Sequence, residues 1–501
     1  MTASIAQRVQ EVLALSPDSG AVEFAGAWTS WRALDQAARQ VETHLHALGA
    51  PADAPIGWVA RNSPAGVAGF VGLLRSGRPI APLRPNLSVR VLCEDIQNQR
   101  LCAIVGNGPD WSVSEAVVDA AKAVGSAGVS IIDNDAHDFS VGLVPGLETI
   151  GPPPHRAEAP GMVVERLSSG TTGPPKRIPV YVDKVLPSLE GAEASQSTSA
   201  GEALRLKSSP SIMLTPFTHA GGIFGLLMAF YQARPIILFD RFDVERWVAA
   251  IERYRPKSAS LVPAMIRMVL NSDAKRESLA SLKAMRSSTA ALDPSTQLEF
   301  EERFGVPILI DYGAAEFLGG VAGWSLADHR EFAKTKLGSV GRPRPDIVLR
   351  IINPDSKQEA PAGAVGQLEL KSERFSPDWI RTNDLARVDE DGFVFIHGRL
   401  DDAINRGGFK ILPDEVAPIM RRFAGVRDAT MVGYPDARLG QVPVAIIEAA
   451  RDIDLEGLRA FLRENLLPYQ VPTDFKVIDA FPRTTTMKID RPALRAMLGL
   501  A

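Results

Sequence analysis

The sequence predicts an α/β protein with a large N-terminal domain and a small C-terminal α+β domain. Two observations predict it. Helical patterns alternate with short apolar runs from residue 21 to about 150. The sequence pattern changes after residues 392–416. A chain of 501 residues is also too long for one ordinary core. We place the boundary near Gly398–Asp401, which gives domains of residues 1–398 and 399–501.

The first part of the chain alternates between helix and strand. Residues 1–17 predict an amphipathic helix rather than a signal peptide, because charged residues stand among the apolar ones. Residues 30–50 place apolar side chains at helical spacing. The segments that follow predict strand, helix and strand in turn: 55–61, 64–77 and 79–83. This order implies a largely parallel sheet.

Further strands are expected along the rest of the chain. A proline-rich connector at 151–161 precedes the strand-like MVVERL at 162–167, and residues 195–210 predict a polar surface segment. Other strand-like runs lie at 211–217, 234–239, 258–264, 306–313 and 347–352. The last 100 or so residues predict two short helices and three or four strands, enough for a small α+β domain.

Composition excludes several kinds of protein. A net charge of −4 gives no basic field for nucleic acid and no polybasic patch for an anionic membrane. The apolar run 223–239 is interrupted by Gln232 and Arg234, which favours core over a membrane span. The two cysteines, Cys93 and Cys102, lack the spacing of a disulfide scaffold or a structural zinc site. We expect a soluble, cytoplasmic monomer or homodimer.

Residues 167–180, LSSGTTGPPKRIPV, concentrate glycine and hydroxyl residues beside positive charge. The glycines allow a sharp turn that aims backbone N–H groups and hydroxyls into one concavity, which is how a loop binds phosphate oxygens. The spacing is not that of a Walker A loop, and a flexible surface linker is the alternative. The strand-like segment that leads into the run favours a phosphate loop. Its residues are Ser168, Ser169, Gly170, Thr171, Thr172, Gly173 and Lys176.

The stretch SSGTTGPPK resembles the phosphate-loop signature of the adenylate-forming superfamily, which includes acyl- and aryl-CoA synthetases, nonribosomal adenylation domains and firefly luciferase. Further stretches resemble the motifs of that family in the same order: PFTHAGG (216–222), SSTAALDP (287–294), DYGAAE (311–316), GSVGRPRPDIVLRI (338–351), IRTNDLARVDEDG (380–392), GRLDDAINRGGFKI (398–411) and FPRTTTMKIDR (481–491). The resemblance is greatest to a stand-alone acyl- or aryl-CoA ligase. It implies an N-terminal AMP-binding domain of stacked mixed and parallel sheets with helices, and a mobile C-terminal domain.

The resemblance also implies ATP, Mg²⁺ and CoA, and a first step in which a carboxylate attacks the α-phosphate of ATP. Glu316 would hold Mg²⁺, and Tyr312 would stack on adenine. Asp384, assisted by Arg399, would accept hydrogen bonds from both ribose hydroxyls. The remaining residues of the implied nucleotide site are Thr289, Ala290, Ala291, Asp311, Gly313 and Ala315.

The small domain carries the most specific implied roles. Lys488 occupies the place of the catalytic lysine of the family, which bridges the carboxylate and the α-phosphate. Asp401 matches the hinge about which the small domain rotates, so that a thiol can attack the acyl-adenylate. The implied thiolation loop contains Gly407, Gly408 and Lys410. Taken singly, these residues have ordinary explanations, such as a turn for the glycines and a solvated charge for the lysine.

The sequence departs from the family pattern at several positions. Ala315 replaces a threonine, which removes a hydroxyl donor to the α-phosphate, and Met487 replaces the glycine before the catalytic lysine. Asn383 replaces a glycine before Asp384, and Thr218 replaces an aromatic residue. Loss of a donor that acts in the transition state costs roughly 2.7–4 kcal/mol.

The implied acid-binding stretches, 217–227 and 315–324, are apolar and rich in glycine. Residues 213–225 hold no aspartate that could bind an α-amine, which favours an aromatic or other bulky hydrophobic acid. His219 matches the histidine of the family that lies near the carboxylate. The expected pocket residues are Phe217, His219, Gly221, Gly222, Leu318 and Gly319.

Three hypotheses about function follow. The leading one is an acyl- or aryl-CoA ligase that activates a hydrophobic carboxylic acid with ATP and transfers the acyl group to CoA, because no carrier domain is fused before residue 501. The second is a stand-alone adenylating enzyme that passes the acyl group to a carrier protein or an amine. The third is a nucleotide-binding protein with little turnover, which the departures at Ala315 and Met487 suggest.

Overall fold

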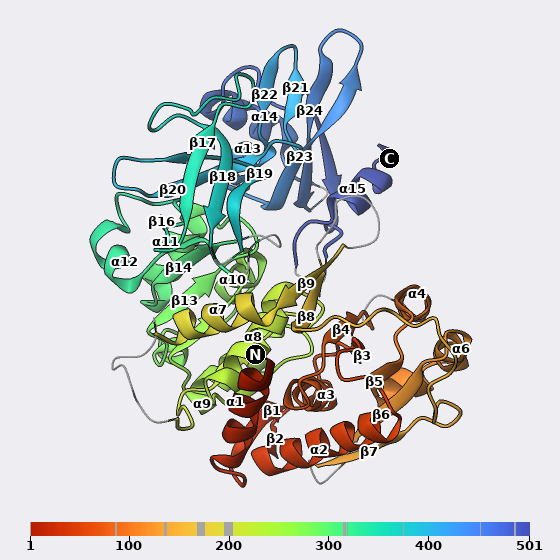
Figure 1. The fold of residues 1–501 in the computed structure, drawn as a ribbon. Helices are drawn as coiled ribbons and strands as arrows, with labels where there is room; N and C mark the ends of the chain where they lie inside the picture. The colour runs from red at the N-terminus through yellow and green to blue at the C-terminus, as the bar shows by residue number, and fades with distance from the viewer. Residues whose placement is uncertain are drawn as a thin grey trace. The chain divides into compact units, whose positions relative to one another are not determined.

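The structure is a computed structural model of the chain (Figure 1). It describes residues 2–85, 88–134, 138–167, 176–194, 204–313, 317, 319–373, 375–450, 452–484 and 487–500. The chain divides into two compact units. The first comprises residues 1–259, 274–283 and 315–319, and the second comprises residues 260–273, 284–314 and 320–501. The boundary expected at residues 398 and 399 lies within the second unit.

The first unit contains a seven-stranded sheet in the order β7-β6-β5-β3-β4-β8-β9. The five inner strands run parallel, and the two edge strands run antiparallel to their neighbours. The strands are β3 (Ile56–Val59), β4 (Ile80–Leu83), β5 (Ala103–Asn107), β6 (Ala127–Asp133), β7 (Phe139–Leu143), β8 (Met162–Leu167) and β9 (Arg177–Tyr181). The predicted α/β alternation is confirmed. Every residue of β3 and β4 is buried, as expected for parallel strands with covered faces.

A four-stranded sheet of the same unit has the order β10-β11-β1-β2. Its strands are β1 (Gly20–Phe24), β2 (Ala27–Ser30), β10 (Ser211–Met213) and β11 (Ile236–Leu238). The core of the unit contains large side chains that are almost fully buried, among them Trp31, Trp58, Phe70 and Phe230.

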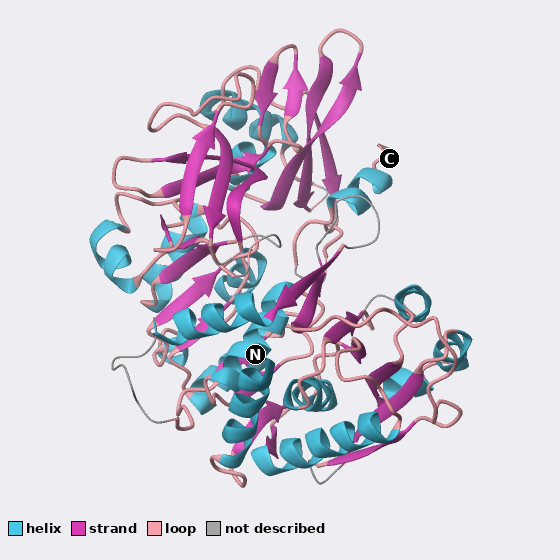
Figure 2. Ribbon diagram, in the orientation of Figure 1, coloured by secondary structure: helices cyan, strands magenta, loops and turns pink. Residues whose placement is uncertain are grey.

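Helices surround these sheets (Figure 2). They are α1 (Thr2–Ala14), α2 (Trp31–Ala47), α3 (Pro64–Arg75), α4 (Val89–Gln99), α5 (Gly108–Ser112), α6 (Glu115–Ala123), α7 (Val182–Ala194), α8 (Ala220–Tyr231), α9 (Val244–Tyr254) and the 3₁₀ helix η1 (Glu277–Leu279). The hydroxyls of Ser30 and Ser63 cap α2 and α3, which fixes where these helices begin.

A five-stranded sheet has the order β12-β13-β14-β15-β16 and belongs to the second unit except for the first two residues of β12. The second unit also has a four-stranded antiparallel sheet in the order β17-β18-β19-β20. The strands of the first are β12 (Ser258–Ser260), β13 (Ala284–Ser287), β14 (Ile308–Tyr312), β15 (Ala322–Gly323) and β16 (Arg342–Pro343). The strands of the second are β17 (Val348–Ile352), β18 (Gly366–Ser372), β19 (Ser376–Val388) and β20 (Val394–Arg399). The accompanying helices are α10 (Pro263–Leu270), α11 (Pro294–Phe304) and α12 (Leu326–Phe332).

The last 100 or so residues form a further sheet with helices of their own. The order is β22-β21-β24-β23, and β25 pairs with β24. The strands are β21 (Ile404–Arg406), β22 (Phe409–Ile411), β23 (Val426–Asp436), β24 (Gly440–Ala449) and β25 (Asp474–Ile478), and the helices are α13 (Pro413–Arg421), α14 (Leu455–Asn465) and α15 (Arg491–Met497). The sequence predicted one helix and at least one strand fewer, because short elements such as β21 and β22 have only three residues each.

Two predictions from composition, on the cysteines and on a membrane span, can be compared with the described residues. The described cysteines, Cys93 and Cys102, are both free thiols. Among the described helices, none combines the length and the apolar character that a membrane crossing requires.

Candidate active site

The predicted phosphate loop connects two antiparallel strands of the first unit. β8 ends at Leu167, which pairs with Arg177 at the start of β9. The expected strand before the loop is therefore present. Lys176 is exposed and stands directly before β9, whereas residues 168–175 lie outside the described residues.

A buried charge network lies within this strand pair. Glu165 on β8 is fully buried and forms ion pairs with Arg156 and with Arg177, the latter at 3.3 Å. Arg177 also approaches Asp95 at 3.7 Å, and Asp95 pairs with Arg84 at 2.7 Å. Burial lowers the pKa of Arg177, although the charges of Asp95 and Glu165 oppose this shift. The network holds the two strands that carry the loop, and the sequence analysis missed it. The acid inside the apolar strand MVVERL was the available signal.

His219 begins helix α8 of the first unit. Its ring Nδ1 accepts a hydrogen bond of 3.1 Å from the amide of Gly221, so the neutral ring carries its proton on Nε2. Gly222 follows in the first turn, where an added Cβ would stand 2.3 Å from the carbonyl oxygen of Pro216. Only glycine fits that position, which ties the local backbone path to the sequence HAGG.

Phe217 contributes to the core rather than to an open surface. Its ring is fully buried and stacks on Trp58 with centroids 5.8 Å apart, and its amide donates to Asn62 Oδ1 at 2.9 Å. His219 is half-buried and Gly221 is exposed. Their expected contact with the acid stays a prediction.

Several predicted residues are not described. Ala315, Glu316 and Leu318 lie outside the described residues, and Gly319 is described with a positive φ of 93°. In the described part of the chain, no group of three or more His, Cys, Asp or Glu side chains could hold a metal ion. The assignment of Glu316 to Mg²⁺ therefore stays a prediction.

Three predicted nucleotide residues come together in the second unit. The hydroxyl of Tyr312, at the end of β14, donates a hydrogen bond to the carboxylate of Asp384 on β19. Asp384 pairs with Arg399 across the antiparallel strands β19 and β20. The amide of Asp384 donates to the Thr382 hydroxyl at 3.1 Å, which fixes the strand backbone at this position. The sheet thus places a phenol, a carboxylate and a guanidinium side by side.

Asp311, next to Tyr312, is held by two arginines that the sequence analysis did not assign. Its carboxylate accepts from Arg286 at 2.6 Å and from Arg344 at 2.5 Å. A Cβ at Gly323 would stand 2.3 Å from Asp311 Oδ1, so glycine is required there. The two arginines fix the backbone that carries Tyr312. Their positions, 25 and 33 residues from Asp311, gave no local signal.

The predicted adenine-wall segment, residues 287–294, contains a backbone outlier. Thr289 has a φ of 73°, which is a strained conformation for a β-branched residue. Ala290 and Ala291 follow it and are both exposed, as is Gly313 after β14. Such strain is often found at ligand sites, which is consistent with the predicted role.

The predicted hinge residue Asp401 is tied to the nucleotide residues. Its carboxylate accepts two hydrogen bonds from Arg399, at 2.9 and 3.0 Å, and one from Asn383 at 3.3 Å. The hydrogen bond from Arg399 lowers the pKa of Asp401. Asn383, a departure from the family pattern, thus acts as an additional donor to the hinge aspartate.

Lys488 lies within the electrostatic reach of the same residues. Removal of water around its ammonium and the charge of Arg399 lower the pKa of Lys488, whereas the charge of Asp384 raises it. The second unit therefore brings Tyr312, Asp384, Arg399, Asp401 and Lys488 into one electrostatic neighbourhood.

The predicted thiolation loop is a tight hairpin between β21 and β22. Gly407 and Gly408 form a two-residue turn, and both have positive φ, 56° and 92°, as a type I′ turn requires. The turn interpretation of these glycines is therefore confirmed, and their role toward a thiol stays a prediction. Lys410 follows the turn and pairs with Asp355 at 3.7 Å.

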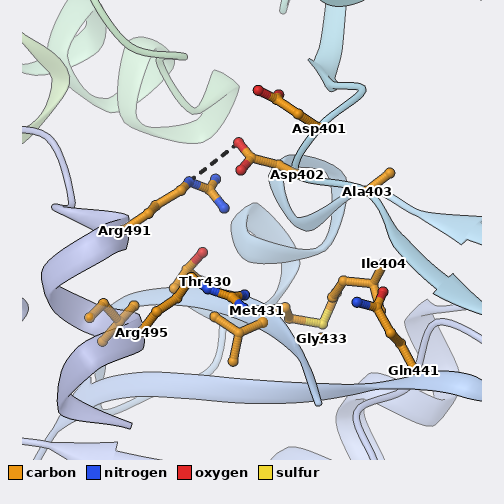
Figure 3. Close-up of a pocket in the computed structure, with 12 residues that line it drawn as sticks. Asp401, Asp402, Ala403, Ile404, Thr430, Met431, Gly433, Gln441, Arg491 and Arg495 are labelled. Atoms are coloured by element: carbon orange, nitrogen blue, oxygen red, sulfur yellow. Dashed lines mark ion pairs between the residues drawn. The ribbon is translucent and has the colours of Figure 1, made fainter. Parts of the chain in front are cut away.

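A cavity of about 100 Å³ lies beside the hinge (Figure 3). It is lined by the hinge residues Asp401 and Asp402, by β23 and by α15, and Arg491 reaches across it to Asp402 at 3.4 Å. Burial raises the pKa of Asp402, while Arg491 opposes this shift. Helix α15 thus contacts the hinge segment through the Arg491–Asp402 ion pair.

Comparisons with known proteins find two family patterns along the chain. The AMP-binding enzyme pattern matches residues 9–376, and the pattern of the AMP-binding enzyme C-terminal domain matches residues 415–488. The chain is 30% identical over 359 residues to the sulfoacetate–CoA ligase of Cupriavidus necator, covering 68% of this chain and 67% of that one. It is 27% identical over 336 residues to the 2-succinylbenzoate–CoA ligase of Enterococcus faecalis, covering 64% and 67%.

A solved structure shows the same fold. The ATP-bound MatB from Rhodopseudomonas palustris superimposes with a TM-score of 0.82 at 21% identity, covering 99% of both chains. The matches confirm the predicted relationship to the adenylate-forming superfamily and bear out the predicted class, an AMP-forming acid–thiol ligase. On the strength of the match over residues 9–376, this chain belongs to the AMP-binding enzyme family.

Proposed function

We propose that this enzyme is an acyl- or aryl-CoA ligase that activates a hydrophobic carboxylic acid with ATP and transfers the acyl group to CoA. The observation that carries the proposal is the neighbourhood of Tyr312, Asp384, Arg399 and Lys488 in the second unit. The ring of Tyr312 can stack on adenine and the carboxylate of Asp384 can bind the ribose. The nearby ammonium of Lys488 can stabilise the negative charge that develops in the transition state.

The first step forms a bond between a carboxylate oxygen of the acid and the α-phosphorus of ATP, and it breaks the bond to pyrophosphate. Both reactants are anions, so fixed positive charge lowers the barrier. In this proposal Asp384 binds the ribose hydroxyls, and Arg399 balances the negative charge of Asp384. Lys488 offsets negative charge on the substrate acid and on the α-phosphate. Bound Mg²⁺ would neutralise phosphate charge, with Glu316 as its predicted ligand.

The second step forms a bond between the CoA sulfur and the acyl carbon, and it releases AMP. The proton of the thiol leaves to solvent or a base. The small domain would rotate about Asp401 between the steps, so that the hairpin with Gly407 and Gly408 replaces Lys488. Because Asp401 is hydrogen bonded to Arg399 and Asn383, this rotation must break or carry along those contacts.

Two arguments bear on the class of acid, and they favour different classes. The apolar, glycine-rich stretch around His219 supports a bulky hydrophobic acid, as expected from the sequence. The names of two relatives, sulfoacetate–CoA ligase and 2-succinylbenzoate–CoA ligase, indicate acids with a second acidic group. The second class is therefore the alternative substrate.

A panel of acids tests the proposal. The purified protein is incubated with ATP, Mg²⁺, CoA and one acid at a time: benzoate and cinnamate derivatives, medium-chain acids, dicarboxylates and sulfoacetate. Acid-dependent release of pyrophosphate, together with a CoA thioester identified by mass spectrometry, is expected with hydrophobic acids. Pyrophosphate release without thioester, restored by a carrier protein or an amine, would instead support the alternative acceptors. No acid-dependent release with any acid would leave only nucleotide binding.

We expect Asp384→Asn to weaken the use of ATP. The amide cannot accept as strongly from two ribose hydroxyls and from Tyr312, so KM for ATP should rise at least about tenfold, as charge-assisted hydrogen bonds are worth roughly 1.5–3 kcal/mol. Asp378→Asn is the matched control, because Asp378 is an exposed acid on the same strand β19. Steady-state kinetics at limiting ATP provide the measurement. An unchanged KM would show that Asp384 does not bind the nucleotide.

A further inference from the structure

The backbone beside Lys488 adopts an unusual conformation. Met487, which stands where the family has glycine, has a φ of 61° in the left-handed region. This region is unfavourable for a residue with a Cβ, and it persists only where surrounding contacts enforce it. The position next to the predicted catalytic lysine therefore needs an identifiable restraint.

Hydrogen bonds supply part of that restraint. The amide of Met487 donates to the carbonyl of Thr484 at 2.9 Å, and the amide of Thr484 donates to the carbonyl of Lys488, also at 2.9 Å. Arg483 and Ile489 form an isolated antiparallel bridge. The described residues on either side of 485–486 are thus closed into a turn whose stem is the Arg483–Ile489 pair.

Arg483 also binds the strained residue directly. One nitrogen of its guanidinium, NH1, donates to the carbonyl of Met487 at 3.2 Å. The other, NH2, donates to Asp428 Oδ2 at 2.8 Å and approaches Glu448 at 3.5 Å. The planar fork of arginine can meet both groups at once, which an ammonium cannot do with the same geometry.

Asp428 gives Arg483 a rigid anchor. Its side chain, on β23, is only 5% exposed and accepts from Arg421 at 3.0 Å and from Arg267 at 3.2 Å as well. Burial alone would raise the pKa of Asp428, but the three arginines outweigh it and lower the pKa. The acid therefore stays ionised at neutral pH and holds Arg483 in one orientation.

We propose that Arg483, anchored by Asp428, is a positioning residue that holds the left-handed backbone of Met487 and so aims Lys488 at the reacting groups. The proposal rests on the role of Lys488 in the proposed function. The departure from glycine at 487 then has a physical consequence. A glycine would turn freely, whereas methionine makes the direction of Lys488 depend on Arg483.

Arg483→Gln tests the proposal. It should lower kcat for acid-dependent pyrophosphate release by about 10- to 100-fold, since misplacing a catalytic group by about 1 Å can cost about 10²-fold. KM for ATP and thioester formation from supplied acyl-adenylate should change less than about twofold, because Lys488 acts in neither. Arg483→Lys should retain part of the activity. Arg427→Gln is the matched control, since Arg427 also approaches Glu448, at 3.9 Å, but has its hydrogen bonds to the carbonyls of Ala449 and Asp479.

The Met487→Gly background separates positioning from general damage. Glycine adopts positive φ without strain, so Arg483→Gln should cost much less in that background than in the wild type. Equal losses in both backgrounds, or equal losses in both half-reactions, would overturn the positioning role.

Two further results separate failure of the proposed function from failure of the positioning role. If Lys488→Ala keeps full pyrophosphate release, the role of Lys488 is wrong, whatever Arg483 does. Hydrogen exchange at the amide of Thr484 reports the turn without any activity. Faster exchange in Arg483→Gln than in Arg427→Gln, with an unchanged melting temperature, is expected, and equal exchange in the two variants would show that Arg483 does not hold the turn.

Discussion

Lys488→Ala should lower acid-dependent pyrophosphate release by about 10²–10³-fold or more, the scale for losing a key electrostatic contact in a transition state. The ammonium lies near Arg399 and Asp384, where the proposal places the ribose and the α-phosphate. Thioester formation from supplied acyl-adenylate should continue at near-normal speed, because that step needs no charge on this lysine. Rapid-quench assays of the two half-reactions provide the measurement.

Two control variants sharpen this prediction. Lys476→Ala removes another lysine of the small domain, whose amine contacts the hydroxyl of Tyr434 at 2.6 Å, and it should leave both half-reactions unchanged. Asp401→Pro fixes φ at the hinge and should spare adenylation while thioester formation collapses. Equal impairment of both half-reactions by Lys488→Ala would show that the small domain does not exchange faces.

The pKa of Lys488 gives the same prediction a pH dependence. Burial of the ammonium and the charge of Arg399 lower it below the ordinary value of 10.5. Lys488 must be charged to act, and a lowered pKa means that the charge is lost at lower pH as pH rises. The adenylation rate should therefore decline with rising pH, with a midpoint below pH 10.5. The rate of thioester formation should show no such decline.

Glu165→Ala should destabilise the first unit by about 3–5 kcal/mol, because removing one partner of a buried ion pair leaves the other charges uncompensated. Glu165 is fully buried between Arg156 and Arg177, and among the described residues the other acid paired with Arg177 is Asp95 at 3.7 Å. The strands β8 and β9 carry the predicted phosphate loop, so weaker use of ATP should accompany the loss of stability.

Urea denaturation measures this effect. Glu158→Ala is the matched control, since Glu158 is an exposed acid of the connector that precedes β8, and it should change the free energy of unfolding by less than about 0.5 kcal/mol. A loss below 1 kcal/mol for Glu165→Ala would contradict the argument that the pair of strands depends on this network.

Local patterns in the sequence predicted most of the fold. The spacing of apolar residues predicted α2, and the short apolar runs predicted β3, β4 and β8, because these elements depend on nearby residues and on burial. The shortest strands of the small domain could not be predicted in this way, since three residues hold too little pattern.

The candidate site was predicted only in part, and the reason is sequence distance. Motif order pointed to Tyr312, Asp384 and Arg399, and the structure brings these three together. No sequence pattern showed which side chains pair to support the site. Arg286 and Arg344 clamp Asp311 from 25 and 33 residues away, and Asp428 binds Arg483 across 55 residues. Such pairs become visible only when the sheets assemble.

The structure also shows what two departures from the family pattern do. Asn383 replaces a glycine, and its side-chain amide donates to Asp401 at 3.3 Å. Met487 also replaces a glycine, and its backbone has a positive φ, which glycine adopts without strain. Another of these departures, Ala315, lies outside the described residues.

The central claim is that the acid is activated as an acyl-adenylate before a thiol takes the acyl group. The most direct test uses an acid accepted by the enzyme and labelled with ¹⁸O in its carboxylate, together with ATP, Mg²⁺ and CoA. The account predicts one ¹⁸O in each AMP formed, none in pyrophosphate, and the remaining label in the thioester carbonyl, because the attacking carboxylate oxygen stays on the α-phosphorus when CoA displaces AMP. Unlabelled AMP alongside labelled thioester, or label in ADP or inorganic phosphate, would contradict it.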